Sequence, residues 1–402
     1  MSTDPPIRSL PNRPNLKHLK NQARDLLKAG AAKSIADAQY RIARLYGFSS
    51  WPKLKSHVAS LAEVGQLKDA IETNDLGRVK ALMSRNPALH QAPLGYGESG
   101  PLTWVAECRV PWGPPSAERL EMARWMIENL SDVHQGGDAP LMRAALNSHR
   151  IPMMELLVSQ GADVNADWDD WFPIIFAPCE SVAPESLNWL LSHGANPNCG
   201  NTSGRGTALD YLIGTYSRSH RLAECIDALL EAGGVTKYDA PGVLDLLRGR
   251  LDRLADQIDA DPKLVYRRFP ELDCGQTGAR RLLLQGATLL HVAAEYGNVE
   301  AANLLLDRGA DVDARATADE AGVGGQTPIF HAVSQFADFG LKVARLLVER
   351  GATLSIRVKL PGHYEKPGEV VECTPRGYAL LFPEGEADRG TVALLRNHAA
   401  PV

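Results

Sequence analysis

Two short stretches of this sequence carry residue types that bind ions. Asp169 and Asp170 are adjacent and Glu180 follows in the next segment, and such carboxylates can ligate a hard cation. Residues 200–206, GNTSGRG, are rich in glycine and could cradle a phosphate with their backbone N–H groups. Adjacent carboxylates are more commonly a solvated turn, however, and a glycine-rich stretch is more simply a connecting loop. We therefore expect neither a metal site nor a cofactor site.

The sequence contains no motif of an enzyme active site. The patterns H-E-x-x-H, G-x-S-x-G and G-x-x-x-x-G-K-[ST] are all absent. His134, His149 and His193 are isolated along the chain and form no ligand set with a cysteine. We therefore expect no catalytic residues and a protein that is not an enzyme.

Tryptophan is concentrated in one part of the chain, where six of the seven lie between positions 104 and 189. Trp112 lies in a loop rich in proline and glycine, and Trp168 and Trp171 flank Asp169 and Asp170 on a turn. An exposed indole buries a large area in a complex at a small entropic cost. We predict that these five residues bind a partner, and the alternative is that neighbouring segments pack over the rings.

Charge is distributed unevenly along this chain of 402 residues, whose net charge is −5. The first 60 residues hold 11 Lys and Arg against 3 Asp, a net charge of +8. The remainder holds 32 basic and 45 acidic residues, a net charge of −13. The length favours several domains or a repeat array, and the two oppositely charged parts are expected to have different partners.

The six cysteines are scattered and include no C-x-x-C pair, which is typical of reduced thiols in a cytoplasmic protein. The start of the chain lacks the apolar segment of a signal peptide, and no run of about 18 apolar residues is present to span a membrane. We therefore expect a cytoplasmic protein with no membrane partner.

The elements that would position these side chains are clearest in residues 287–316. Leu289–Ala294 predict a short first helix, which ends at Gly297 because glycine accepts a positive φ without a steric penalty. Leu304–Leu306 belong to the apolar stripe of a second helix, which Gly309 closes. The run T-L-L-H-V-A-A followed by L-L-L-D-R-G-A-D-V-D-A resembles an ankyrin repeat, a turn and two helices of about 33 residues.

The resemblance covers most of residues 67–400 and implies an all-α ankyrin-repeat solenoid, built from helix pairs with short hairpin loops. The repeat endings G-A-D-V-N-A and G-A-N-P-N lie 33 residues apart, which is the ankyrin period. A gapless shift of 175 residues also brings residues 67–91 into register with a second divergent repeat. We therefore predict a first ankyrin block at residues 62–236 and a second at residues 237–402.

Two details within the repeats have a mechanical explanation. Thr327 and Thr374 each precede a proline, because threonine can cap a helix N-terminus and proline fits its first turn. His291 lies where ankyrin repeats carry a histidine, and the resemblance implies that it bonds the backbone of a loop.

A small basic module is expected ahead of the repeats. Residues 1–15 are rich in proline and are predicted to form a disordered arm. Residues 16–61 predict three helices, and A-Q-Y-R-I-A-R-L-Y-G-F-S-S-W-P-K-L-K is similar to a module ahead of many bacterial ankyrin arrays. Such a module would cap the repeat stack. Its helix–Gly–helix spacing also resembles a helix-turn-helix, so nucleic-acid contact through residues 16–61 is an open alternative.

In ankyrin proteins the hairpin tips and the exposed side of the first helices form a concave groove that binds protein partners. The resemblance therefore implies that six side chains point into this groove: Glu107, Glu180, Tyr216, Glu295, Tyr296 and Gln335. Because the array is acidic, we expect a partner of basic or mixed charge and an association that salt weakens.

Three functions of different classes are consistent with this sequence. We favour a non-enzymatic protein-binding scaffold that uses the concave groove and the hairpin tips, although a repeat fold does not name its partner. The second is a regulator whose basic module contacts nucleic acid while the array binds a protein. The third is an enzyme that uses an irregular loop, residues 317–325 or 359–372, and it requires a deep polar pocket with clustered titratable groups.

Overall fold

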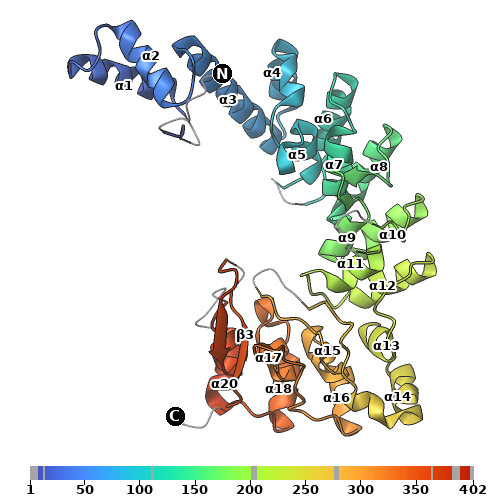
Figure 1. Ribbon diagram of the computed structural model, residues 1–402. Helices are drawn as coiled ribbons and strands as arrows, with labels where there is room; N and C mark the ends of the chain where they lie inside the picture. The colour runs from blue at the N-terminus through green and yellow to red at the C-terminus, as the bar shows by residue number, and fades with distance from the viewer. Residues whose placement is uncertain are drawn as a thin grey trace. The chain divides into compact units, whose positions relative to one another are not determined.

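The computed structural model of this protein describes residues 8–11, 14–109, 113–200, 206–275, 280–363, 365–382 and 390–398 (Figure 1). The chain divides into two compact units. The first is Met1–Ala144 with Pro152–Ala162, and the second is Ala145–Ile151 with Asp163–Val402. Helices make up most of both units, as the sequence predicts.

The first unit contains helices α1 to α7, nearly all of α8, and two 3-10 turns, η1 and η2. The bounds are α1 (Leu16–Lys28), α2 (Ile35–Leu45), α3 (Trp51–Glu72), α4 (Leu76–Arg85), η1 (Pro87–Gln91), η2 (Tyr96–Glu98), α5 (Pro101–Glu107), α6 (Ala117–Glu128), α7 (Gln135–Ala145) and α8 (Ile151–Ser159). Gly136, Gly137 and Asp138 have positive φ, so the regular turns of α7 begin only after them.

The second unit contains helices α9 to α20, three 3-10 turns and two antiparallel hairpins, β1 with β2 and β3 with β4. The bounds are η3 (Ser148–Arg150), β1 (Asp167–Trp168), β2 (Phe172–Pro173), α9 (Phe176–Ser181), α10 (Pro184–Ser192), α11 (Ala208–Gly214), α12 (Leu222–Glu231), α13 (Val243–Leu247), α14 (Leu251–Ala260), η4 (Pro262–Tyr266), α15 (Leu289–Glu295), α16 (Val299–Asp307), α17 (Pro328–Val333), η5 (Phe336–Asp338), α18 (Leu341–Glu349), β3 (Val358–Pro361), β4 (Val370–Cys373), α19 (Pro375–Ala379) and α20 (Gly390–His398).

Helices α1, α2 and α3 pack around one small core in the first unit. Leu19, Ile42 and Leu54 supply one buried side chain from each helix. Each helix begins at a polar side chain that accepts a hydrogen bond from a backbone N–H of the first turn: Asn15, Ser34 and Ser50.

The three-helix core is joined to the rest of the first unit and is not a detached module. Helix α3 runs without a break through residues 61 and 62, where the sequence divides the module from the first block, so one helix joins the two. The described part of the predicted arm lies against the helices: the Arg8 N–H donates to Leu45 O at 3.0 Å, and Leu10 packs on the core. Residues 1–7, 12 and 13 lie outside the described residues.

The helix pair that the sequence predicts most clearly is confirmed in the second unit. Helix α15 ends at Glu295, and Gly297 follows it with a φ of 65°. Asn298 then accepts a hydrogen bond from the Ala301 N–H at 2.9 Å and begins α16. Leu305 of α16 is fully buried, as expected for its apolar stripe.

Successive helix pairs stack on one another in the second unit. First helices pack on first helices, α9 on α11, and α15 on α17 on α19. Second helices do the same, α10 on α12, and α14 on α16 on α18 on α20. Figure 1 shows α15 and α17 in one row and α16 and α18 in the row beside it. This is the all-α repeat solenoid that the sequence predicts.

The predicted duplication is visible in the local structure. Helices α4 and α14 both contain 10 residues, and after one residue each is followed by a 3-10 turn of 5 residues. The linking residues have nearly the same conformation: Asn86 has φ −132° and ψ 87°, and Asp261 has φ −134° and ψ 88°. The gapless shift in sequence therefore relates residues 76–91 to residues 251–266, which have the same succession of helix and 3-10 turn.

All six cysteines are free, and five of them are buried. Burial raises the pKa of Cys225 and of Cys274 to about 12, so both thiols stay protonated near neutral pH. These free cysteines agree with the expectation of reduced thiols in place of a disulfide framework. In the part of the chain that the structure describes, no helix has both the length and the apolar character needed to cross a membrane.

Candidate functional site

The hairpin formed by β1 and β2 carries two of the predicted tryptophans at its tip. Trp168 pairs with Phe172 in the ladder, and the Trp171 N–H donates to Trp168 O at 3.2 Å. Asp169 and Asp170, between the two indoles, have positive φ of 51° and 56°. Short polar side chains tolerate this left-handed conformation better than others, which explains why two aspartates form a tight turn here.

The two indoles belong to an aromatic cluster that continues into the repeat core. The ring centroids of Trp168 and Trp171 lie 5.6 Å apart, and both rings contact the buried Phe172 at 6.2 and 5.5 Å. Phe172 meets Tyr211 edge to face at 5.6 Å, and Tyr211 stacks on Phe176 at 4.4 Å. Both tryptophans remain partly exposed, while Asp169 and Asp170 are exposed. Phe172 thus supports both indoles from within the repeat core.

Glu180 extends this cluster along the neighbouring helices. One of its oxygens accepts a hydrogen bond from the Tyr211 hydroxyl at 2.7 Å, and the other accepts one from the Tyr216 hydroxyl at 2.6 Å. Tyr216 is itself 50% exposed. We call the set Trp168, Asp169, Asp170, Trp171, Glu180 and Tyr216 the hairpin patch. All six were predicted from sequence as partner-binding residues, and packing brings them into one neighbourhood.

Two other residues predicted to face the groove are buried. Glu107 is 1% exposed and pairs with Arg143 at 2.6 Å. Gln335 is also 1% exposed, and its Nε2 donates to His331 O at 3.1 Å. The prediction that Glu107 and Gln335 point into an open groove is wrong, because each side chain turns inward to a polar partner within the fold.

Glu295 and Tyr296 were placed in the groove as well, and they are also buried. Glu295 is 0% exposed and accepts hydrogen bonds from Arg280 at 2.6 and 2.7 Å, from Arg218 at 2.7 Å and from His331 Nδ1 at 2.7 Å. The Arg218 guanidinium lies over the Tyr296 ring, 4.7 Å from its centroid. This prediction is therefore wrong too, because an internal charge cluster occupies both side chains. We call Glu295, Arg218, Arg280 and His331 the Glu295 cluster.

The ionisation of the Glu295 cluster follows from its composition. Burial alone would raise the pKa of Glu295, but the two guanidinium groups and the His331 hydrogen bond outweigh it and hold that pKa below its ordinary value. Burial lowers the pKa of His331, against the pull of Glu295. Glu295 is therefore ionised at neutral pH, and the cluster carries more positive than negative charge inside the protein.

The remaining predictions concern Trp112 and the two possible ion sites. Trp112 and residues 201–205 of the glycine-rich stretch lie outside the described residues. Among the residues that are described, no three His, Cys, Asp or Glu side chains are grouped so as to hold a metal ion. Asp169 and Asp170 are accounted for as turn residues.

Comparison with known proteins fits this geometry. A family model described as ankyrin repeats, in three copies, matches residues 116–201 and 262–358. The chain contains ankyrin repeats. The first matched segment includes β1, β2 and the tip of the hairpin patch, and the second includes α15 to α18. The tip of the hairpin patch, residues 168–171, therefore lies at the loop that joins successive ankyrin helix pairs.

One curated relative is the "ADP-ribosylation factor GTPase-activating protein AGD4" of Arabidopsis thaliana, which is 32% identical over 123 residues. The match covers 29% of this chain and 15% of that protein. The chain thus spans a small part of the length of this relative, and the likeness is one of a segment.

His291 has the role that the ankyrin resemblance implies. Its Nδ1 accepts from the Thr288 N–H at 3.2 Å and lies 2.9 Å from the Thr288 hydroxyl. Its Nε2 lies 3.0 Å from Gln326 O and donates to it, since Nδ1 is the acceptor. Burial lowers the pKa of His291 to about 3, so the ring is neutral and ties its own repeat to the loop before the next.

The following ankyrin repeat departs from this arrangement. His331 follows Thr327 by four residues, whereas His291 follows Thr288 by three, so Phe330 takes the position of the loop-bonding histidine. The Thr327 hydroxyl is buried and has no hydrogen-bond partner among the described residues, whereas Thr374 caps α19 by accepting from the Gly377 N–H. The predicted cap is confirmed at Thr374 and wrong at Thr327. The one-residue offset turns His331 toward Glu295, and this spacing was a signal that sequence reasoning missed.

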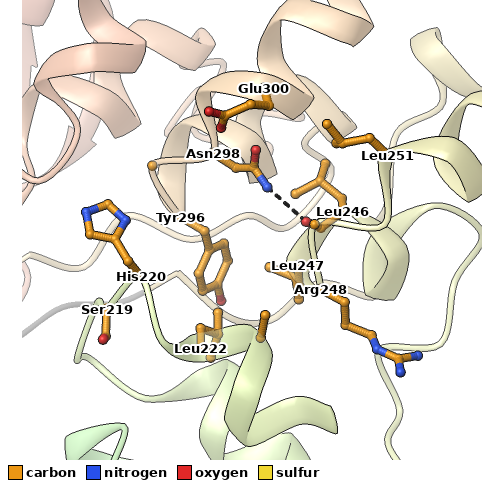
Figure 2. A pocket seen from close by; sticks show the side chains of 13 residues that line it. Ser219, His220, Leu222, Leu246, Leu247, Arg248, Leu251, Tyr296, Asn298 and Glu300 are labelled. Carbon is orange, nitrogen blue, oxygen red and sulfur yellow. Dashed lines mark hydrogen bonds between the residues drawn. The ribbon is translucent and has the colours of Figure 1, made fainter.

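A pocket of about 300 Å³ lies between α12, the turn from α13 to α14 and the turn from α15 to α16 (Figure 2). Asn298 Nδ2 crosses its wall to donate to Leu246 O at 3.1 Å. Figure 2 shows the titratable side chains His220, Arg248 and Glu300 at separate edges of the pocket. Ser219 and His220 are neighbours in this lining, but among the described residues no hydrogen bond joins their side chains, and the His220 ring stacks on Phe339 with ring centroids 4.7 Å apart.

Proposed function

We propose that this chain is a non-enzymatic ankyrin scaffold that binds a protein partner through the hairpin patch. The observation that carries the proposal is the pair of half-exposed indoles beside two exposed carboxylates at a repeat tip. Ankyrin repeats supply a surface for binding and not a reaction centre. We infer that the partner lies along the concave side, to which the hairpin tips belong.

The geometry of the patch favours tight contact at low entropic cost. Phe172 supports both indoles from below, so their ring positions are largely set before a partner arrives. The hydrogen bond to Glu180 likewise orients the exposed Tyr216 ring. Rigid aromatic rings of this kind supply most of the binding energy at protein interfaces. Asp169 and Asp170 add negative charge at the tip, so we infer a partner segment that is basic or mixed in charge.

Replacing Trp168 and Trp171 together with alanine is expected to abolish most partner binding and to change folding little. The rings lie on a surface hairpin, and losing their edge-to-face contacts with Phe172 costs about 1–3 kcal/mol in all. The loss of two anchors should weaken binding at least about a hundredfold. The measurement is quantitative capture of cell-lysate proteins on the immobilised chain, followed by titration of the protein that is retained.

The matched control separates charge from conformation. Asp169→Asn with Asp170→Gly removes both charges and leaves Asn-Gly, the sequence that best adopts a turn with two positive φ values. This variant should keep the hairpin and lose only the salt-sensitive part of the binding. Equal retention of the partner by the wild-type chain and by the double tryptophan variant would show that the patch is not the binding site.

A second candidate function is nucleic-acid contact by the basic module, because the first 60 residues carry a net charge of +8 and Lys53 and Lys55 are exposed on α3. Since α3 continues to Glu72, the test is a substitution in the full chain and not a truncation. Lys53→Gln with Lys55→Gln should weaken a low-salt gel shift of duplex DNA about tenfold or more. Absence of a shift with the unmodified chain removes this candidate.

The enzymatic alternative depended on residues 317–325 or 359–372. These two segments meet, since the Gly324 N–H donates to Lys359 O at 2.8 Å, and a cavity lies beside them. Among its described lining residues are four cationic side chains and Glu372, with no serine, cysteine or histidine. Such a lining can bind an anion but offers no activated nucleophile, so we do not favour catalysis there.

A further inference from the structure

The irregular loop between α16 and α17 and the hairpin between α18 and α19 form one structure. Gly324 and Val323 bridge to Lys359 at the start of β3, and Ala318 bridges back to Gly324. Neither segment belongs to the helix pairs of the repeats. The cavity that they border has a volume of about 460 Å³.

Positive charge gathers in this cavity. Arg268, Arg315, Arg357 and Lys359 line it, against a single carboxylate, Glu372. Glu372 accepts from Arg357 Nε at 3.3 Å and so offsets that one charge. Within the described part of the chain, the side chains of Arg268, Arg315 and Lys359 have no ion-pair partner. Three uncompensated cations around one cavity are unusual in a chain whose net charge is −5.

Part of the wall between these side chains is glycine. Gly322, Gly324 and Gly325 line the cavity and have positive φ of 76°, 118° and 70°. A Cβ on Gly325 would lie 3.9 Å from Arg315 Nη1, so the guanidinium group lies close to bare backbone. With no side chain there, ligand oxygens can approach the guanidinium group and the backbone together.

We propose that this cavity binds a small soluble anion that carries several phosphate groups. Guanidinium groups match phosphate oxygens with paired hydrogen bonds, and three unpaired cations favour a ligand with more than one negative charge. The volume exceeds what a single phosphate fills, and no aromatic side chain lines the described wall to stack a nucleobase. The phosphates themselves therefore provide the recognition.

The surroundings argue for a small ligand over an extended anionic surface. Asp319 and Glu320 are exposed on the same loop, next to the cavity. A membrane of anionic lipids would have to meet these carboxylates as well as the arginines, whereas a small ion enters the cavity between them. We therefore expect a soluble source of phosphate and not a lipid headgroup.

The test uses the full chain and inorganic tripolyphosphate as the probe, measured by isothermal titration calorimetry at low ionic strength. Saturable binding at one site is expected. Replacing Arg315 and Lys359 together with glutamine should weaken it by about tenfold for each cation removed. The matched control replaces Lys342 and Arg345, two exposed cations of α18 outside the cavity, with glutamine and should leave the affinity unchanged.

Three results would overturn the proposal. The first is that tripolyphosphate does not bind the unmodified chain. The second is an equal loss in the Lys342 and Arg345 control, which would indicate general attraction to surface charge. The third comes from vesicles that contain a phosphoinositide: sedimentation with the vesicles without tripolyphosphate binding would assign the cavity to a lipid. Because the hairpin patch is untouched by these substitutions, failure here is distinguishable from failure of the scaffold function.

Discussion

Glu295→Gln is expected to lower the free energy of unfolding of the second unit by about 3–5 kcal/mol, as for other buried ion pairs that lose one partner. Glutamine has nearly the size of glutamate, so no cavity forms. The substitution removes the carboxylate shared by Arg280 and Arg218, whose side chains are 1% and 5% exposed. Both buried guanidinium groups lose this counter-ion, and urea unfolding followed by circular dichroism measures the loss of stability.

The chain offers a matched control for this experiment. Glu300 lies five residues further on, in the first turn of α16, and is exposed. Glu300→Gln removes the same charge but only a weak helix-dipole interaction, so its cost should stay below about 1 kcal/mol. Equal effects of the two substitutions would show that the Glu295 cluster contributes no more than a surface charge.

A second substitution tests whether unpaired charge is the cause. Arg280→Met in the Glu295→Gln background removes one of the two buried cations that have lost Glu295. It should recover part of the lost stability, because an apolar side chain is well tolerated in a buried site. If the cost of Glu295→Gln came from packing alone, the second substitution would add a further loss.

The Glu295 cluster also marks where sequence reasoning reached its limit. The spacing of the ankyrin repeat placed Glu295 and Tyr296 at the end of a first helix, a position that faces the groove in a regular array. Arg280 lies 15 residues from Glu295, and Arg218 lies 77 residues away in a loop between α11 and α12. No local periodicity connects residues at such separations, so their pairing is decided by tertiary packing alone.

Local features, in contrast, were predictable because their causes are local. Gly297 ends α15 through its own φ, and Asn298 begins α16 through a hydrogen bond within one turn. The tip at Asp169 and Asp170 follows the same rule, since both residues adopt the left-handed conformation. The turn at the hairpin tip could therefore be predicted from sequence, while the burial of four residues of the predicted groove set could not.

The phosphate proposal also depends on a tertiary feature that sequence showed only in part. Residues 317–325 and 359–372 stand out as irregular insertions, which is why they were considered for catalysis. Gly324 pairs with Lys359 in the structure, and this pairing brings Arg315 and Lys359 to one cavity. The positive charge of the two insertions points to an anion only because of this arrangement. We considered these two insertions as a possible catalytic site from the sequence, and we now propose that they bind an anion.

Lowering the pH from about 6.5 to about 5.5 is expected to destabilise the second unit before most carboxylates titrate, with His291 as the main cause. Its folded pKa is lowered to about 3 from the ordinary value near 6.5. The unfolded chain therefore binds a proton in this range that the folded chain excludes. Stability is fully present above pH 6.5 and falls with pH by about 1.4 kcal/mol per unit for each such histidine.

The structural reason is the hydrogen-bond pattern of His291. Its Nδ1 accepts from the Thr288 N–H, and a proton placed there would break that bond and leave a charge 0% exposed. Burial also lowers the pKa of His331, so protonation of this residue in the unfolded chain lowers stability in the same direction. Calorimetric melting at a series of pH values measures the slope, and His291→Gln should start less stable but lose stability less steeply as pH falls.

Two comparisons make the assignment specific. His149 is exposed, so His149→Gln should keep the slope of the wild-type chain. Glu295, whose folded pKa is lowered, contributes stability that is lost as pH falls through the ordinary carboxyl value of about 4.5, so it adds little to the slope above about pH 5.5. A flat profile between about pH 6.5 and 5.5, followed by a steep fall, would assign acid sensitivity to carboxylates such as Glu295 and not to the loop-bonding histidine. The pH at which stability begins to fall therefore shows whether the His291 hydrogen bonds or the Glu295 cluster is lost first.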